Sequence, residues 1–306
     1  MKTLNSKISD LTKQIAKELL KCHVGQKIPT TSELAQKFSV GYGTIEKAMT
    51  ALKEMRAIKV QPKGQMGTYL LDKNSAALWS IMDSGPIRGS LPLPNTLEFQ
   101  GLASGLTESL KEKNIDCSFS VKNGAKLRIN ELLNNQCDFV LLSQQAAVWG
   151  CEKYENLKIL GTFDDKSYYG DMIVLCRKDA SNKVEEWRIG VDETSLDHIE
   201  FTNNLFEKNE KVKVMYMHSP YLIADGFIDA AVWHSSQLVP TMLIDTLTFR
   251  PVSYEENKSG INSMAGAIIV NKDHGEIASL LTELCDIERV LEIQKEVIAR
   301  KRIPYY

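Results

Sequence analysis

Several features that would assign this chain to a class at once are missing from its sequence. No run of about 18 apolar residues is present, so no helix is expected to cross a membrane. The opening stretch MKTLNSKISDLTKQ has no apolar core followed by small residues, so we expect no export signal. Six scattered cysteines form no CxxC pair, which is typical neither of a zinc site nor of a disulfide framework. We therefore expect a cytoplasmic protein that does not bind a membrane.

Motifs for catalysis and metal binding are also missing. The five histidines never fall at HxH or HExxH spacing, so no metal site is predicted. Residues 64–67, GQMG, lack the Lys-Ser/Thr ending of a phosphate loop and precede a strand pattern. In residues 101–105, GLASG, the serine is one place away from where a nucleophile elbow needs it, and we attribute the small residues to close packing of a helix on a sheet. We predict no enzyme, no catalytic residue, no metal and no cofactor.

Charge is unevenly distributed along the chain. Overall, 37 Lys and Arg stand against 39 Asp and Glu, a net charge of −2. Residues 1–75 have a net charge of +7, whereas residues 76–306 have a net charge of −9. Because basic side chains supply most of the affinity for nucleic acid, only the first part of the chain is suited to contact phosphates.

The basic part contains two short helical patterns joined by a turn. In residues 28–52, IPTTSELAQKFSVGYGTIEKAMTAL, apolar residues recur at helical spacing on both sides of the turn. Thr30 and Glu33 form a capping-box pattern that predicts where the first helix begins. Residues 8–20 predict a helix upstream, and residues 57–61 and 68–71 predict two strands around KGQMG. The sequence thus predicts a winged helix-turn-helix.

Polar side chains on the second helix and in the wing are the candidates for contacting double-stranded DNA. They are Tyr42, Thr44, Lys47, Thr50 and Lys63. The lysines suit the phosphate backbone, while Tyr42 and Thr44 suit thymine methyl groups or phosphates. A small helical domain that only packs or dimerises is the alternative, because helix pairs are common in proteins.

This segment resembles the winged helix-turn-helix of the GntR regulators, whose usual run is close to LPSERELAxxFGVSRGTVRxAL followed by GRGTFV. The matching residues are Pro29, Glu33, Leu34, Ala35, Phe38, Val40, Gly43, Thr44, Ala48, Gly67, Thr68 and Tyr69. The resemblance implies DNA binding. Where that family usually has arginines, this chain has Ser32, Tyr42 and Glu46, none of which makes the bidentate contacts of arginine. A binding or interaction protein whose helix-turn-helix has lost DNA affinity is therefore a second hypothesis.

The rest of the chain alternates short apolar runs with helical patterns, which predicts an α/β domain. The runs that indicate buried strands are residues 138–142, 172–175, 188–191, 213–216, 230–233 and 266–270. Helical patterns cover residues 98–113, 126–135 and 197–208, and one long helix is predicted over residues 275–300. Such alternation predicts a mostly parallel sheet, with a ligand site in the loops beyond the carboxyl ends of its strands.

The length of this part is sufficient for two lobes of about 100 residues each. Residues 168–178 and 266–270 are the segments expected to connect the lobes, as in the type II periplasmic-binding fold. PLPNTLEFQGLASGL from Pro92, NGAKLRINELLNNQCDF from Asn123, YYGDMIVLCRK from Tyr168, RIGVD from Arg188 and FIDAAVWH from Phe227 resemble the YhfZ family. That resemblance covers almost the whole chain and implies a transcriptional regulator that joins a GntR-like DNA-binding end to a solute-binding-like body.

Polar residues that follow predicted strands or begin predicted helices are the candidates for ligand binding. They are Asn95, Thr96, Asn123, Ser143, Asp192, Thr194, Ser195, His218, Trp233 and His234. Amides at helix starts, with hydroxyl or amide side chains beside them, favour a small anionic or hydroxylated effector. Ordinary strand ends explain the two histidines equally well, and a tryptophan that ends a strand is more typical of core packing. Lys122 and Arg128 are further sources of charge, although surface positions explain both.

The sequence thus predicts three segments. Residues 1–71 form the DNA-binding domain, residues 72–85 a linker, and residues 86–306 the two-lobed effector domain. The apolar linker is either a short docked helix or an extended connector. We expect a homodimeric transcriptional regulator that responds to a small molecule, and an enzyme on the α/β part is the remaining alternative.

Overall fold

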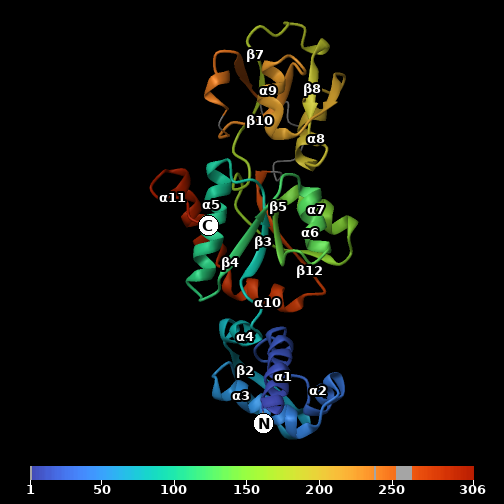
Figure 1. Cartoon of the computed structure of the whole chain (residues 1–306), viewed down its shortest axis with the longest axis vertical. Helices are drawn as coiled ribbons and strands as arrows, with labels where there is room; N and C mark the ends of the chain where they lie inside the picture. Colours follow the sequence, from blue (N-terminus) through green and yellow to red (C-terminus); the bar gives the residue numbers. More distant parts are fainter. Residues whose placement is uncertain (1, 238, 253–263) are drawn as a thin grey trace. The chain divides into compact units, whose positions relative to one another are not determined.

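The computed structural model describes residues 2–237, 239–252 and 264–306 and divides into two compact units. Unit 1 contains the residues up to Ile87 together with Ser109–Cys117 and Asp273–Asp286. Unit 2 contains Arg88–Glu108, Ser118–Lys272 and Ile287–Tyr306 (Figure 1). Among the described residues, no helix has both the length and the hydropathy needed to span a bilayer.

Unit 1 begins with three helices, α1 (Lys2–Leu20), α2 (Thr31–Phe38) and α3 (Tyr42–Glu54). The predicted capping box is present at α2: the amide of Glu33 donates to the side chain of Thr30, and the Glu33 carboxylate accepts the Thr30 amide hydrogen. Ser39, at φ 54°, ends α2 in the left-handed region. The apolar stripes of α2 and α3 are buried, which confirms the helix-turn-helix.

A two-stranded hairpin and two further helices complete unit 1. Strand β1 (Ile58–Pro62) pairs antiparallel with β2 (Thr68–Lys73) around a short helix, η1 (Gly64–Met66). Helix α4 (Ser75–Met82) occupies most of the predicted linker, so that segment is a helix and not an extended connector. Helix α10 (Gly275–Leu284) packs on α1 and α4 although it lies late in the sequence. Ion pairs hold it there, among them Lys17 with Glu276 at 2.9 Å and the buried Lys73 with Glu283 at 2.7 Å.

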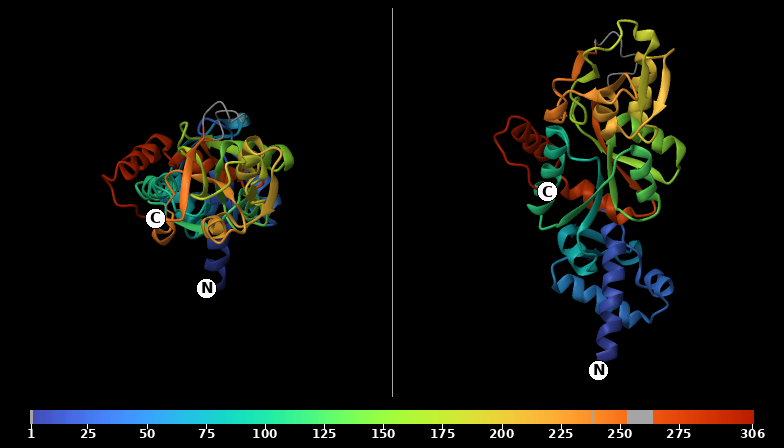
Figure 2. Two further views of the ribbon diagram at one scale, coloured as in Figure 1. Left: turned by 90° about the horizontal axis from the view of Figure 1, so that it is seen from above. Right: turned by 45° about the horizontal axis from the view of Figure 1, so that its top comes forward.

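Unit 2 contains two lobes, each built on its own five-stranded sheet. The first sheet has the order β4-β3-β5-β12-β6, from strands β3 (Ile87–Leu91), β4 (Cys117–Val121), β5 (Phe139–Ser143), β6 (Leu157–Thr162) and β12 (Gly266–Asn271). Helices α6 (Ala125–Leu133) and α7 (Gln144–Lys153) pack on it and share one core cluster with β5 and β12 (Figure 1). Helices α5 (Leu97–Lys111) and α11 (Ile287–Ile298) lie side by side elsewhere on this lobe (Figure 2).

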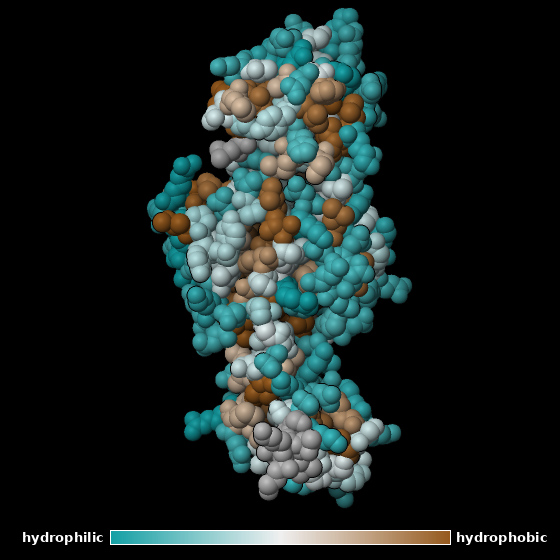
Figure 3. Space-filling model, viewed as in Figure 1, coloured by the Kyte–Doolittle hydropathy of each residue, from teal (hydrophilic) through white to brown (hydrophobic). Residues whose placement is uncertain are grey.

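The second sheet has the order β11-β7-β10-β8-β9. Its strands are β7 (Met172–Arg177), β8 (Arg188–Val191), β9 (Glu210–Lys213), β10 (Ala230–His234) and β11 (Leu247–Pro251). Alternate residues of β10 face opposite cores, because side chains alternate along a strand: Val232 packs with α8 (Leu196–Leu205), and Trp233 packs with α9 (Ser219–Ala224). Three short helices, η2 (Val184–Glu186), η3 (Tyr216–His218) and η4 (Thr241–Leu243), lie in the connections. On the face seen in Figure 3, hydrophilic residues predominate and hydrophobic residues form separate patches.

The fold confirms the predicted α/β class but corrects the expectation of mostly parallel sheets. Strand β12 runs antiparallel to β5 and β6, and β7 runs antiparallel to β10 and β11. Strand β3 pairs parallel with β5, and β8 pairs parallel with both β10 and β9. The cause is the connection between lobes, since a strand that enters a sheet from the other lobe has no crossover helix to make it parallel.

Two expectations about where elements end are also wrong. The strand predicted over residues 213–216 ends at Lys213, and the Asp192 carboxylate accepts the amide hydrogen of Tyr216, which begins η3. The single helix predicted over residues 275–300 is two helices, α10 and α11, with the amide of Asp286 donating to the side chain of Ser109 between them.

The two glycines of GLASG face a neighbouring helix, where the sequence predicted packing on a sheet. A Cβ atom on Gly105 would lie 2.6 Å from the carbonyl oxygen of Val290, and one on Gly101 would lie 2.8 Å from Cγ of Gln294. Both of these neighbours belong to α11. The glycines therefore allow α5 and α11 to approach closely.

Candidate functional site

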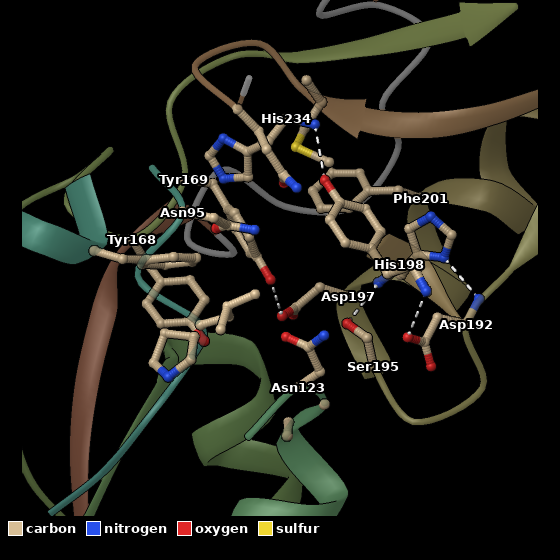
Figure 4. A pocket seen from close by; sticks show the side chains of 18 of the residues that line it. Asn95, Asn123, Tyr168, Tyr169, Asp192, Ser195, Asp197, His198, Phe201 and His234 are labelled. Carbon is tan, nitrogen blue, oxygen red and sulfur yellow. Dashed lines mark hydrogen bonds between the residues drawn. The ribbon is translucent and has the colours of Figure 1, made fainter. Parts of the chain in front are cut away.

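A cavity of about 70 Å³ lies within unit 2, lined by residues of both lobes and of the segment that connects them. The first lobe contributes the loop after β3, a residue of α5 and the start of α6. The connecting segment contributes Tyr168, Tyr169 and Met172, and the second lobe contributes the start of α8 and the end of β10 (Figure 4). Its size is suited to a small metabolite or a few waters.

Five of the ten ligand-binding residues predicted from the sequence line this cavity. They are Asn95, Asn123, Asp192, Ser195 and His234. They come together because loops after strands of both lobes converge there, as the sequence predicted for strand ends.

The other five do not line the cavity. Thr96 accepts a hydrogen bond from the amide of Phe99, and Thr194 donates to the Asp192 carboxylate at 2.6 Å. Trp233 is 1% exposed and stacks on Tyr216, the core-packing alternative, while His218 is exposed. Any role of these residues in ligand binding stays a prediction.

Ser143 links the two lobes beside the cavity. Its hydroxyl accepts the amide hydrogen of Ala146, which caps α7, and donates to Asp197 of the second lobe at 2.7 Å. Lys126 adds a second link, donating to the carbonyl oxygen of Glu193 at 2.9 Å. These direct bonds join the two lobes, so the cleft between them is closed in this structure.

An aromatic wall runs along the cavity. The ring of Tyr169 packs against Tyr168 at 4.7 Å and against His234 at 4.8 Å between centroids, and Phe99 lies 4.8 Å from Tyr168. Tyr169 also donates its hydroxyl hydrogen to Asp197 at 2.9 Å, as Figure 4 shows. The wall is therefore tied to the same carboxylate that joins the lobes.

The charged groups of the cavity are buried, and burial shifts their protonation. Burial raises the pKa of Asp197 to about 6, although the hydrogen bonds from Ser143 and Tyr169 and the charge of Arg128 lower it. Burial lowers the pKa of His198, whose Nδ1 accepts the Asp192 amide hydrogen while Nε2 lies 3.1 Å from the carbonyl oxygen of Val232. Burial also lowers the pKa of His234 to about 4, so this ring is neutral near pH 7.

Sequence reasoning missed several members of the site. Tyr168 and Tyr169 lie in a segment that was assigned only to connecting the lobes, and Asp197 lies inside the first turn of a predicted helix. Arg128, for which a surface position was an equal alternative, is 3% exposed. A usable signal existed for the tyrosines, since a connecting segment must border the cleft between the lobes.

The residues predicted to contact DNA lie at the surface of unit 1. Tyr42 is 59% exposed and lies within hydrogen-bonding distance of Ser32, at 3.3 Å between hydroxyl oxygens. Lys47 and Thr50 are exposed on α3, and Thr44 is partly exposed. In the hairpin, the Lys63 ammonium lies 4.5 Å from the ring centroid of Tyr69. The side chains predicted to contact DNA thus present hydroxyl groups from α3 and ammonium groups from α3 and the hairpin to solvent.

Comparison with known protein families gives two matches. Residues 74–306 match the family model described as the YhfZ C-terminal domain, and residues 23–70 match a helix-turn-helix domain. The protein YhfZ of Escherichia coli strain K12, itself uncharacterised, is 26% identical over 297 residues, which cover 95% of each chain.

Solved structures of similar fold include a member of the same family. The crystal structure of YhfZ from Shigella flexneri superposes with a TM-score of 0.60 and 27% identity, covering 76% of this chain and 98% of that one. The VFT2 domain of Bordetella pertussis BvgS gives a TM-score of 0.51 at 15% identity, covering 73% of this chain and 96% of that domain. An amino acid transporter substrate-binding protein from Streptococcus pneumoniae, bound to L-arginine, gives 0.50 at 12% identity, covering 74% and 98%. The last two similarities show a shared fold.

Proposed function

The chain belongs to the YhfZ family, and we propose that it is a transcriptional regulator whose binding to DNA responds to a small molecule held between the lobes of unit 2. One observation carries the proposal: a helix-turn-helix and a two-lobed body with a closed, polar and aromatic cavity occur in one chain. A helix-turn-helix reads DNA, and a cleft between two lobes is where a small ligand binds. We propose further that the body binds its ligand without converting it.

The electrostatics of the chain support a DNA-binding role for its first part. The net charge of +7 in residues 1–75 favours phosphates, and the exposed Lys47 and Lys63 belong to α3 and to the hairpin. We propose that α3 enters the major groove and that the β1–β2 hairpin acts as the wing. We also propose that the regulator is a cytoplasmic homodimer, since a dimer doubles the contacts with a symmetric operator.

A mobility-shift assay with the promoter of its own gene tests this function. The chain should shift that fragment, and the triple variant Tyr42→Ala, Thr44→Ala, Lys47→Ala should not. Lys208→Ala, at an exposed position of unit 2, is the matched control and should bind like the native chain. Equal binding by the triple variant would contradict the proposal. It would favour the second candidate, an interaction protein with a degenerate helix-turn-helix, which Ser32, Tyr42 and Glu46 in place of arginines support.

A further inference from the structure

Two residues that line the cavity have a buried polar atom with no hydrogen-bond partner among the described residues. These atoms are Nε of Arg128 and Nε2 of His234. Arg128 is 3% exposed and His234 is 2% exposed, so bulk water does not replace the missing partners. Buried polar groups in native proteins are nearly always paired, which makes two orphans beside one cavity a sign that something else pairs with them.

Arg128 supplies an unused donor. Its Nη1 donates to the carbonyl oxygen of Lys122 at 2.6 Å, and its Nη2 donates to the hydroxyl of Tyr168 at 2.8 Å. These two bonds fix the guanidinium group in place and leave the Nε hydrogen free. Because guanidinium is always charged, its best partner is an anionic oxygen.

His234 supplies an unused acceptor, because its neighbours determine which ring nitrogen holds the proton. The hydroxyl of Ser236 donates its one hydrogen to Glu98 at 2.7 Å. Nδ1 of His234 lies 3.3 Å from the same hydroxyl oxygen, which can then only accept, so the proton lies on Nδ1. Nε2 therefore presents a lone pair, and its partner must be a hydrogen-bond donor.

The side chains of the two orphans contact different rings of the aromatic wall. Tyr168 accepts a hydrogen bond from Arg128. The ring of Tyr169 packs on the ring of Tyr168 and on His234 (Figure 4). Asp192 and Asp197 also line the cavity. The anion belongs beside Arg128, whose Nε is a charged donor, and the donor belongs beside His234, whose Nε2 is an acceptor.

We propose, on the premise of the proposed function, that the cavity takes a small carboxylate that also has a hydrogen-bond donor, a hydroxyl or an amine, at its other end. The carboxylate pairs with Nε of Arg128, and the donor pairs with Nε2 of His234. The carbon atoms between them lie along the rings of Tyr168 and Tyr169. Binding thereby satisfies both orphaned atoms with a single molecule.

Calorimetry on the full chain tests this ligand class with probes that differ by one group. The probes are ω-hydroxy acids of two to five carbons, the plain alkanoates and the diols of equal length, and the matching ω-amino acids. One hydroxy acid or amino acid should bind about tenfold more tightly than the alkanoate and the diol of its length. Comparison of the ω-amino acids with the ω-hydroxy acids shows whether an amine or a hydroxyl is the preferred donor, and preference for either supports the proposal.

Two variants assign each end of the ligand. His234→Asn keeps an amide nitrogen near Ser236 but has no acceptor at the position of Nε2, because its side chain is shorter. It should weaken binding of the hydroxy acid about tenfold and binding of the alkanoate less than twofold. Arg128→Lys keeps a positive charge but removes the Nε donor, and it should weaken both acids while sparing the diol. His23→Asn, at an exposed histidine of unit 1 outside the cavity, should change neither. Alkanoate binding by His234→Asn also shows that the variant is folded.

Three results would overturn the ligand class: equal binding of the hydroxy acid, amino acid and alkanoate, equal loss of both acids in His234→Asn, or no binding by any probe. None of these results changes the interpretation of the mobility-shift assay, which requires no ligand. Conversely, a chain that fails to bind DNA but shows the probe preference retains the ligand class and loses the role in transcription.

Discussion

The hydroxyl of Ser143, at the end of β5 in the first lobe, donates a 2.7 Å hydrogen bond to Asp197 of α8 in the second lobe. The same hydroxyl oxygen caps α7 through the amide of Ala146. One side chain therefore serves both the local structure of a helix and the closure of the cleft. Both Ser143 and Asp197 are buried, so water cannot replace this bond.

Replacing Ser143 by alanine should remove both bonds. Loss of the cap should cost about 1 kcal/mol of unfolding free energy. The Asp197 oxygen left without its donor should cost a further 1–3 kcal/mol or so. Scanning calorimetry on the full chain measures the sum, and Ser143→Thr, which keeps a hydroxyl, is the matched control. An alanine variant as stable as the native chain would show that the bond between the lobes contributes nothing.

The protonation of Asp197 should make stability depend on pH. Its pKa rises from 3.8 to about 6 on folding, so the folded chain retains a proton that the unfolded chain loses. This stabilisation is present at low pH and is lost as the pH rises through 6. Lowering the pH from 7 to 5 should therefore raise the unfolding free energy of the native chain by about 1.4 kcal/mol relative to Asp197→Asn. This is the value of the one pH unit that lies below the pKa of the folded state. Parallel melting temperatures of the two chains across this range would refute the shift.

His234 should show the opposite dependence. Burial lowers its pKa from 6.5 to about 4, so the unfolded chain takes up a proton that the folded chain does not. The native chain should lose stability relative to His234→Asn as the pH falls from 6.5 toward 4. Comparing each variant with the native chain separates the two groups, whose effects cancel in the native chain between pH 4 and pH 6. Melting temperatures measured in one set of buffers suffice.

Two glycines should respond to alanine in opposite ways. At Gly105 the added Cβ meets the Val290 backbone oxygen at 2.6 Å, so Gly105→Ala should destabilise unit 2 by about 1–3 kcal/mol. At Gly43, in helix α3, no atom lies within 4 Å of that position. Gly43→Ala should stabilise the helix by up to about 1 kcal/mol, because alanine has the higher helix propensity. Calorimetric melting of both variants tests the close approach of α5 and α11.

Lys63 should contribute to DNA affinity without selecting a sequence. Lys63→Ala should weaken all DNA fragments alike and reduce the slope of log affinity against log salt concentration by about one, as loss of one phosphate contact does. Tyr42→Ala should instead change which sequences are preferred. Anisotropy titrations at several salt concentrations measure both effects. An unchanged slope in Lys63→Ala would place the hairpin away from the DNA backbone.

Local patterns in the sequence were sufficient for the helix-turn-helix and for most buried strands. The capping box of Thr30 and Glu33 depends on residues three places apart, and strand and helix periods depend on neighbours within a few turns. The same local reasoning located Asn123 and Ser195 at the starts of helices, and both line the cavity.

Expectations that depended on distant partners were the ones that failed or were missed. Periodicity cannot show that a strand returns from the other lobe, so it could not predict that β12 runs antiparallel to β5. It also could not show that Asp286 would pair with Ser109 and divide the last helix in two. Such contacts join residues more than a hundred positions apart.

The sequence by itself determined that this protein joins a helix-turn-helix to an α/β body, because hydrophobic period, helix caps and charge distribution are local properties. Only the tertiary structure decided which polar groups are left without partners. The orphaned Nε of Arg128 depends on where Lys122 and Tyr168 lie, and the proton on Nδ1 of His234 depends on Ser236 and Glu98. Hydrogen bonding is directional and short-range, so these chemical properties arise only when the folded chain brings such residues together.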